Sequence, residues 1–175
     1  MTHPIRPTDN EARQLAHRLL YEARFASLAV LDAHKSPFVS RIAFGLTASR
    51  TPLSLISTLS HHTNYMIASK DVSLLIGEPL AKGDPLTYPR MTLQARAEFI
   101  ARTEPKSESL KETWLKLHPK SQLYIDFTDF KFILFSIQKA YLNGGFGKAY
   151  ILSAEDLKSD KKSGFRKDNE THQKT

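Results

Sequence analysis

A run of five polar residues, Ser60-His61-His62-Thr63-Asn64, follows a predicted strand and begins a predicted helix. A helix N-terminus presents free N–H groups and a partial positive charge, so it binds phosphate well. Ordinary helix capping by Ser60 or Thr63 is the more common use of such residues. The adjacent histidines would point apart on a helix or strand, and no third ligand follows at a metal-binding spacing. The sequence therefore predicts a phosphate site or a cap here, and no metal site.

Arg41 is the second residue that could bind an anion. It lies in the middle of a strand predicted at 38–45, where an arginine disturbs an apolar surface unless it pairs with a carboxylate or binds an anion. Both explanations stay open for this residue alone. Ser57 and Thr58 end the next predicted strand, 53–59, beside the predicted helix start. Arg41, Ser57 and Thr58 are therefore candidates to converge on one phosphate.

The third candidate, Gln94, lies in a long strand predicted at 90–101. Apolar residues alternate there with polar ones: Met91, Leu93, Ala95, Ala97 and Phe99 against Thr92, Gln94, Arg96 and Glu98. Such a strand lines a closed β core with its apolar face. The amide of Gln94 on the other face suits a polar heterocycle, although a strand residue that simply faces water explains it too.

A glycine-rich segment, Gly144–Gly147, precedes Lys148. It lacks the strand–GxGxxG–helix context of a nucleotide site. A hairpin turn that needs positive φ explains it, and so does a turn whose backbone approaches a ligand beside Lys148. No Ser/His/Asp set or carboxylate pair has supporting context, so no catalytic residue is identified.

The composition narrows the class of partner. The 175 residues carry a net charge of +7, which favours acidic partners, and without a nucleic-acid motif a phosphate ligand is preferred over nucleic acid. The chain has no cysteine, which excludes disulfides and thiolate metal sites. It shows no secretory signal and no apolar run of membrane-spanning length. We expect a cytoplasmic protein that does not bind membranes.

The elements around these residues predict one domain over 1–158. Helices are predicted at 8–24, from Ser60 to about Lys70, and at 107–118; further strands at 25–31, 72–77, 130–138 and 139–143; and 121–127 is ambiguous. Strands joined mostly by turns predict a largely antiparallel, barrel-like sheet, mainly β within the α+β class. A terminal helix is predicted near Ser153–Asp156, and the polar tail 159–175 is expected to be disordered.

The order of these motifs resembles the FMN-binding split-barrel superfamily related to pyridoxamine 5'-phosphate oxidase, closest to the HugZ-type haem-utilisation branch. The resemblance covers roughly residues 11–157. The motifs that carry it are Ser40-Arg41, Ser57–Leu59, Ser60–Asn64, Gly83–Leu86, Arg90–Ala97 and Gly144–Ala149.

The resemblance implies an antiparallel split β-barrel with flanking short helices, and a homodimer with FMN in a cleft between subunits. It implies that Arg41, Thr58, His62, Thr63 and Asn64 lie near the phosphate and ribityl chain, that Gln94 approaches the isoalloxazine, and, more weakly, that Lys148 contributes. Two features depart from the pattern. The Arg/His-bearing segment that grips the substrate of a true oxidase is missing, as is the further domain of many haem-utilisation relatives.

The resulting hypothesis is an FMN-binding oxidoreductase that acts on an unidentified small molecule. One alternative is a haem-binding or haem-degrading protein in which His61, His62, His118 or His172 ligates iron. The other is a flavin carrier or sensor without enzymatic activity. For each histidine, a capping or surface role is the favoured explanation.

Overall fold

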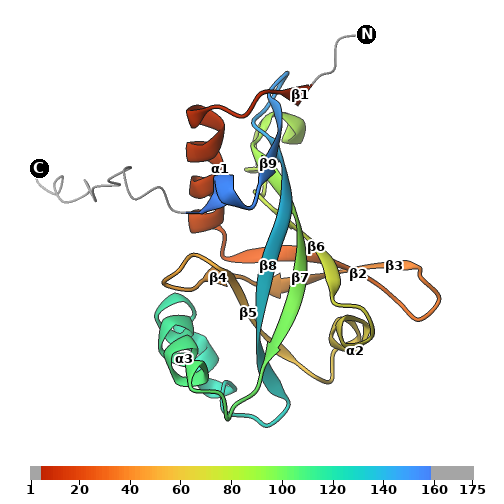
Figure 1. Ribbon diagram of the computed structural model, residues 1–175, viewed down its shortest axis with the longest axis vertical. Helices are drawn as coiled ribbons and strands as arrows, with labels where there is room; N and C mark the ends of the chain where they lie inside the picture. Colours follow the sequence, from red (N-terminus) through yellow and green to blue (C-terminus); the bar gives the residue numbers. More distant parts are fainter. Residues whose placement is uncertain (1–4, 159–175) are drawn as a thin grey trace, which may run out of the picture.

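The computed structural model describes residues 5–158, which form a nine-stranded sheet curled into a barrel with helices at its margins (Figure 1). The sheet order is β1-β9-β8-β7-β6-β2-β3, and β5 joins β8 to β4. The strands are β1 (Ile5–Arg6), β2 (Phe25–Leu31), β3 (Pro37–Ala43), β4 (Gly45–Leu46), β5 (Pro52–Ser57), β6 (Asp71–Ile76), β7 (Arg90–Ile100), β8 (Phe130–Asn143) and β9 (Ala149–Ser153). Among the described strands only β1 and β9 pair in parallel. The predicted mainly β, largely antiparallel split-barrel fold is confirmed.

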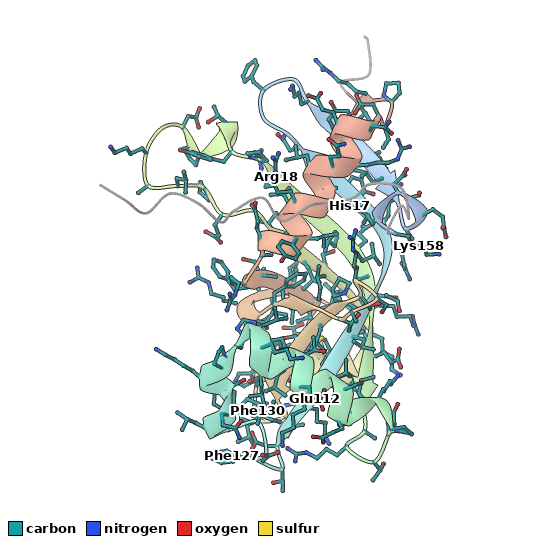
Figure 2. The ribbon with its side chains drawn as sticks, turned by 90° about the vertical axis from the view of Figure 1, so that its left-hand side faces the viewer. His17, Arg18, Glu112, Phe127, Phe130 and Lys158 are labelled. Carbon is teal, nitrogen blue, oxygen red and sulfur yellow. The ribbon has the colours of Figure 1, made fainter. Side chains whose placement is uncertain are left out.

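Three α-helices and three short 3-10 helices flank the sheet. They are α1 (Asn10–Glu22), α2 (His61–Ala68), α3 (Lys106–Leu117), η1 (Pro85–Thr87), η2 (Pro119–Leu123) and η3 (Glu155–Leu157). Asp9 caps α1 by accepting from the Ala12 N–H at 2.8 Å, whereas the Thr8 hydroxyl donates to the carbonyl of Ile151 in β9. The residue before the cap is thus fastened to the sheet. Helices α1 and α3 lie on one side of the molecule, which faces the viewer in Figure 2.

The long strands β7 and β8 connect the two halves of the barrel. The predicted inward residues of β7 from Met91 to Ala97 are buried, which confirms the alternation read from the sequence. The break predicted between Gln138 and Lys139 is wrong, because one strand runs through it with a β-bulge opposite Gln94 and Ala95. The extra residue shifts the alternation by one, so that Phe135 before it and Ala140 after it both face the core.

Other differences concern short elements. The strands β1 and β9 were not predicted, and the predicted terminal helix is the single 3-10 turn η3. The ambiguous segment 121–127 begins within η2 and continues as turns. The expected tail, 159–175, and His172 within it lie outside the described residues.

The apolar residues form two clusters on opposite sides of the barrel wall. One fills the barrel and includes Leu28, Phe44, Leu74, Leu93 and Phe135. The other lies outside the wall, beneath α3, and consists of Leu53, Leu55, Ile100, Leu110, Trp114, Ile125 and Phe132. Helix α3 therefore covers part of the outer face of the sheet and forms a second hydrophobic cluster with it.

One test bears on membranes. Within residues 5–158, none of the helices is both long enough and apolar enough to span a bilayer.

Candidate functional site

The start of α2 offers free backbone donors. Ser60 occupies the N-cap position with extended backbone, but its side chain makes no capping bond. Thr63 does not cap either, since its buried hydroxyl donates to the Ser57 carbonyl at 2.7 Å. In the described part of the chain, the N–H groups of His61 and His62 have no hydrogen-bond acceptor. This helix end therefore keeps the donors that an anion requires.

Asp129, which the sequence analysis did not single out, braces the loop before α2. Its Oδ2 accepts from the Ser57 hydroxyl at 2.5 Å, and its carbonyl accepts from the Thr58 N–H at 2.8 Å. The Ser57 hydroxyl also accepts from the Leu59 N–H at 3.1 Å. The hydroxyl groups of Ser57 and Thr63 thus form hydrogen bonds that stabilise the loop. The hydroxyl of half-buried Thr58, in contrast, makes no hydrogen bond within the described chain.

His62 joins α2 to β3. Its Nδ1 lies 3.0 Å from the hydroxyl of Ser40, while the neighbouring His61 stacks on Tyr65 and meets Phe38 edge-on. Burial, and secondarily the nearby His61, lower the pKa of His62 below 6.5. The imidazole of His62 is therefore neutral at physiological pH. Asn64, one turn along, is exposed.

Arg41 leaves β3 on the face opposite to Ser40, because successive strand residues alternate. Its guanidinium lies over the ring of Phe25, 4.8 Å from the centroid. No carboxylate of residues 5–158 comes within 4.0 Å of it, so the ion pair considered from the sequence is not formed there. The side chain is exposed and its charge is available to an anion.

Gln94 shares this outer face with Arg41. Arg41 pairs with Ser27, Ser27 with Leu75, and Leu75 with Thr92, which is two residues from Gln94 on β7. Three strand spacings and a two-residue offset separate Arg41 from Gln94 by roughly 15 Å. The Gln94 side chain is exposed, and its Oε1 accepts a long hydrogen bond of 3.4 Å from the Tyr141 hydroxyl.

The outer face between these residues is open and partly apolar. The exposed fractions are 63% for Val39, 44% for Leu75 and 39% for Tyr141, all on this face. We call this surface, from Arg41 on β3 to Gln94 on β7, the open strip. None of the helices α1, α2 and α3 forms the kind of buried cluster over it that α3 forms over β5.

Lys148 lies elsewhere. It is exposed in the β8–β9 turn, beyond Asn143, whereas Ser57 pairs with Phe130 at the opposite end of β8. Along an extended strand this is a separation of about 40 Å, and Figure 1 shows the turn and α2 near opposite ends of the sheet. The predicted positive φ of the turn is present at Gly145 (107°) and Gly147 (68°). One chain does not bring Lys148 to α2.

Of the histidines considered as iron ligands, His118 is engaged in the fold. Its Nε2 lies 2.9 Å from the Phe44 carbonyl, and its ring centroid lies 4.3 Å from that of Trp114. Burial is the main cause that lowers its pKa below 6.5. Within the described residues, no three His, Asp or Glu side chains gather in a group that could hold a metal ion.

The structure thus sorts the predicted site residues into three groups. Ser57, Thr58, His62, Thr63 and Asn64 meet at the start of α2; Arg41 and Gln94 share the open strip; Lys148 is remote. The first two groups are connected through β3, where Arg41 follows Ser40, whose hydroxyl bonds to His62. Among the described residues, no hydrogen bond joins Arg41 itself to α2.

Comparison with known proteins places this geometry in context. A family model described as "CREG, beta-barrel" matches residues 7–159. The chloroplastic heme oxygenase HOZ of Arabidopsis thaliana is 25% identical over 124 residues, which are 71% of this chain and 37% of that protein. The structure of a heme binding protein from Mycobacterium smegmatis superposes with a TM-score of 0.76 at 24% identity, covering 87% of this chain and 61% of that one.

A third similarity is more distant. A Clostridium acetobutylicum protein of the pyridoxinephosphate oxidase family, related to general stress protein 26, has a TM-score of 0.64 at 10% identity and covers 86% of this chain and 99% of that one. The resemblance to split-barrel proteins related to pyridoxamine 5'-phosphate oxidase, on the haem-utilisation side, is confirmed. The chain spans only 37% of HOZ and 61% of the mycobacterial protein.

Proposed function

Because the chain belongs to the CREG β-barrel family, we propose that it is a homodimeric flavoprotein that holds FMN on the open strip and oxidises or reduces a small molecule with it. The observation that carries the proposal is the strip itself. It has at one end a cation that no carboxylate of residues 5–158 pairs with, an amide at the other end, and exposed apolar side chains alongside. The cytoplasmic location expected from the sequence belongs to this proposal.

The phosphate end is assigned to the exposed edge of β3, the last strand of the sheet, where Arg41 would reach the phosphate from the outer face and the start of α2 from the opposite face, which carries Ser40. A guanidinium matches the oxygens of a phosphate in two parallel hydrogen bonds. The N–H groups of His61 and His62 add neutral donors at a helix N-terminus. The exposed amide of Asn64 and the hydroxyl of Thr58 are the further polar groups of this end, and Asp129 keeps their loop in place.

The ring end is assigned to Gln94. Its amide can both donate and accept, which matches the carbonyl and N–H groups along the edge of a polar heterocycle. When bound, FMN would supply the electron transfer. The residues of this chain bind and orient the flavin, and none is assigned a catalytic role.

The second subunit is assigned to the same face. Val39 and Leu75 leave apolar surface in contact with water, and a partner that buried it would also exclude water from the flavin. Lys148, about 40 Å along β8 from Ser57, would serve this site only from the second subunit.

Haem is the second candidate ligand, and His62 is the observation in its favour. A neutral imidazole is the form that ligates metals, and the lowered pKa of His62 maintains it. The Ser40 hydroxyl occupies Nδ1 and leaves Nε2 as the remaining ring nitrogen. HOZ and the mycobacterial protein are named for heme. On the haem hypothesis, His62 is the residue to test first.

The deciding experiment offers purified full-length protein FMN, haemin or both, removes free ligand by gel filtration and records the visible spectrum. We expect the flavin to be retained at one per subunit. Retained haem whose spectrum changes in His62→Ala, with no retained flavin, would replace the flavin proposal by the haem one. Reduction by a nicotinamide donor, followed by several turnovers, would separate an enzyme from a flavin carrier or sensor.

A further inference from the structure

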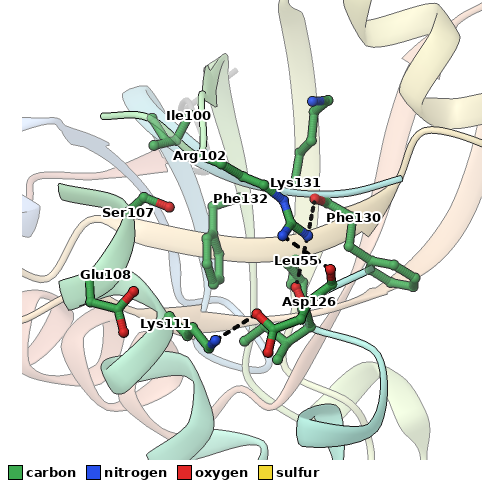
Figure 3. A pocket seen from close by; sticks show the side chains of 11 residues that line it. Leu55, Ile100, Arg102, Ser107, Glu108, Lys111, Asp126, Phe130, Lys131 and Phe132 are labelled. Atoms are coloured by element: carbon green, nitrogen blue, oxygen red, sulfur yellow. Dashed lines mark hydrogen bonds and ion pairs between the residues drawn. The ribbon is translucent and has the colours of Figure 1, made fainter. Parts of the chain in front are cut away.

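A cavity of about 130 Å³ lies beneath α3, on the outside of the barrel wall (Figure 3). Its walls come from the first two turns of α3, the end of β7, the start of β8 and the loop before β8. We call it the α3 pocket. Its lining residues are Leu55, Ile100, Arg102, Ser107, Glu108, Lys111, Ile125, Asp126, Phe130, Lys131 and Phe132. None of them belongs to the open strip or to the start of α2.

The floor of the α3 pocket is apolar and rigid. Leu55, Ile100, Ile125 and Phe132 are all at most 7% exposed and belong to the second hydrophobic cluster. A water needs about 10–15 Å³ of such space, so the pocket has room for on the order of ten small-ligand atoms. This is far too small for haem or FMN, because sites for molecules of that size measure about 300–1,000 Å³.

Arg102 supplies a fixed positive charge at the rim. Its guanidinium donates to the carbonyls of Ile125 and Asp126, both at 3.1 Å, to that of Phe127, and to that of Phe130 at 3.4 Å. These bonds use Nη1 and Nη2 and orient the group without neutralising it. No carboxylate of residues 5–158 lies within 4.0 Å of Arg102. Its Nε donor also has no acceptor in that part of the chain, so the charge and one N–H remain for a ligand.

The opposite rim comes from one face of α3. Ser107, Glu108 and Lys111 face Arg102 and Asp126 across Phe132 in Figure 3. Lys111 is neutralised by Asp126, with Nζ 2.6 Å from Oδ1. The Ser107 hydroxyl has no hydrogen-bond partner among the described residues, and Glu108 has no cation within 4.0 Å there. With Lys131, the charged lining residues sum to +1.

We propose that the α3 pocket binds a compact monocarboxylate with an apolar body. The floor would bury the apolar part, and Arg102 with the Ser107 hydroxyl would receive the carboxylate. Glu108 repels a second negative charge, which disfavours phosphate monoesters and other dianions. The site is separate from the proposed flavin site, since none of its lining residues belongs to the open strip or to the start of α2.

Phenylacetate, which has ten non-hydrogen atoms, is the probe. Full-length protein with its cofactor is titrated while amide NMR shifts are recorded, alongside 2-phenylethanol, acetate and phenyl phosphate. We expect saturable shifts at amides of the α3 pocket with phenylacetate, and at least tenfold weaker binding of the other three compounds. No saturable shift, or equally tight binding of 2-phenylethanol, would overturn the proposal.

Two α3 variants localise the binding. Ser107→Met places a long side chain in the cavity and should weaken phenylacetate at least tenfold, whereas Ser109→Met, at an exposed position of the same helix, should leave its affinity unchanged. Equal affinity in both variants would contradict the assignment. Glu108→Gln keeps the experiment decisive if Ser107→Met does not fold. This variant should increase the affinity for phenyl phosphate more than the affinity for phenylacetate. An unchanged ratio of the two affinities would refute the charge argument.

Discussion

The outer face of the sheet is covered by a helix in one region and exposed in another. Over β5 and the start of β8, α3 covers outward apolar residues and buries Leu53 and Trp114 completely. Over the open strip, from Arg41 on β3 to Gln94 on β7, none of the described helices does this, and Val39 remains 63% exposed. Both regions belong to the same wall, so the backbone does not distinguish them.

The side chains of the two regions differ in chemistry. Beneath α3 they are large and apolar. The open strip combines Ser27, Ser73 and Thr92 with an exposed amide and with an arginine that has no carboxylate partner in the described part of the chain. A covered wall requires apolar volume, and an open wall of polar and moderately apolar groups fits a polar ligand and a second subunit. We infer that α3 stabilises the domain and that the open strip carries its function.

Removing the centre of the α3 cluster should have the largest effect. Trp114→Ala should lower the free energy of unfolding by about 3–5 kcal/mol, because a fully buried aromatic ring is lost. Trp114→Phe should cost much less, since the Trp114 Nε1 donor is buried without a partner and its loss carries no penalty. Urea unfolding measures both. FMN affinity of the folded variants should be unchanged, and a parallel loss of affinity would break the distinction between the regions.

A negative charge introduced on the open strip should weaken dimerisation rather than folding. Val39→Asp would bury an uncompensated carboxylate in the proposed subunit interface, which costs about 3 kcal/mol and weakens the dimer roughly a hundredfold. The stability of the isolated subunit should hardly change, because this side chain is exposed there. Sedimentation equilibrium reports the dissociation constant. Leu123→Asp, at a 79% exposed position away from the sheet, is the control, and equal dimerisation of the two variants would remove the interface from this face.

Arg41→Ala should weaken FMN binding by about 1.5–3 kcal/mol, the usual scale of a charge-assisted hydrogen bond. Calorimetric titration of the apoprotein measures this loss. Arg18→Ala, at an exposed position on α1, lowers the net charge equally and should leave the affinity unchanged. An unchanged dissociation constant in folded Arg41→Ala would leave Arg41 with its contact to Phe25 alone.

The smallest expected effect is a pH dependence of stability. The pKa of His62 and that of His118 are lowered from 6.5 in the folded state, so the unfolded state binds more protons as the pH falls below that value. The contribution of the two histidines to stability should be fully present above about pH 6.5 and should decline as the pH falls below it. Urea unfolding of His62→Asn and of His118→Gln should each show a shallower decline than the wild type.

Ligand binding separates the two histidines. An anion at the start of α2 favours protonated His62 and should reduce its share of the decline, whereas His118, at the C-terminal end of α3, should not respond. An FMN-induced change that persists in His62→Asn and vanishes in His118→Gln would reverse the assignment of the two regions.

The sequence predicted the elements that have strong periodicity. The alternation of β7 and the amphipathic pattern of α1 and α3 follow directly from burial on one face. The strand β1 escaped prediction because two exposed residues are too few for a pattern, whereas β9 was overlooked although its buried residues alternate. The bulge opposite Gln94 was mistaken for a break, because an extra residue reverses the alternation just as a turn would.

The sequence indicated which residues are candidates for the site, but only partly how they are arranged in space. Strand alternation already implies that Ser40 and Arg41 point to opposite faces of β3. The brace from Asp129 to Ser57 joins residues 72 positions apart, and no local pattern reveals it. The separation of Lys148 from α2 depends on the register of β8 with β5 and β9, which the sequence does not specify.

The most direct test of the central claim is whether the open strip recognises the phosphate of a flavin. Full-length apoprotein is titrated with FMN and with riboflavin, which differ only in that phosphate, and flavin fluorescence is followed. We predict that FMN binds at least tenfold more tightly than riboflavin, since in the proposed site Arg41 and the α2 donors would contact only the phosphate. Equal affinities, or no saturable binding of either flavin, would contradict the account.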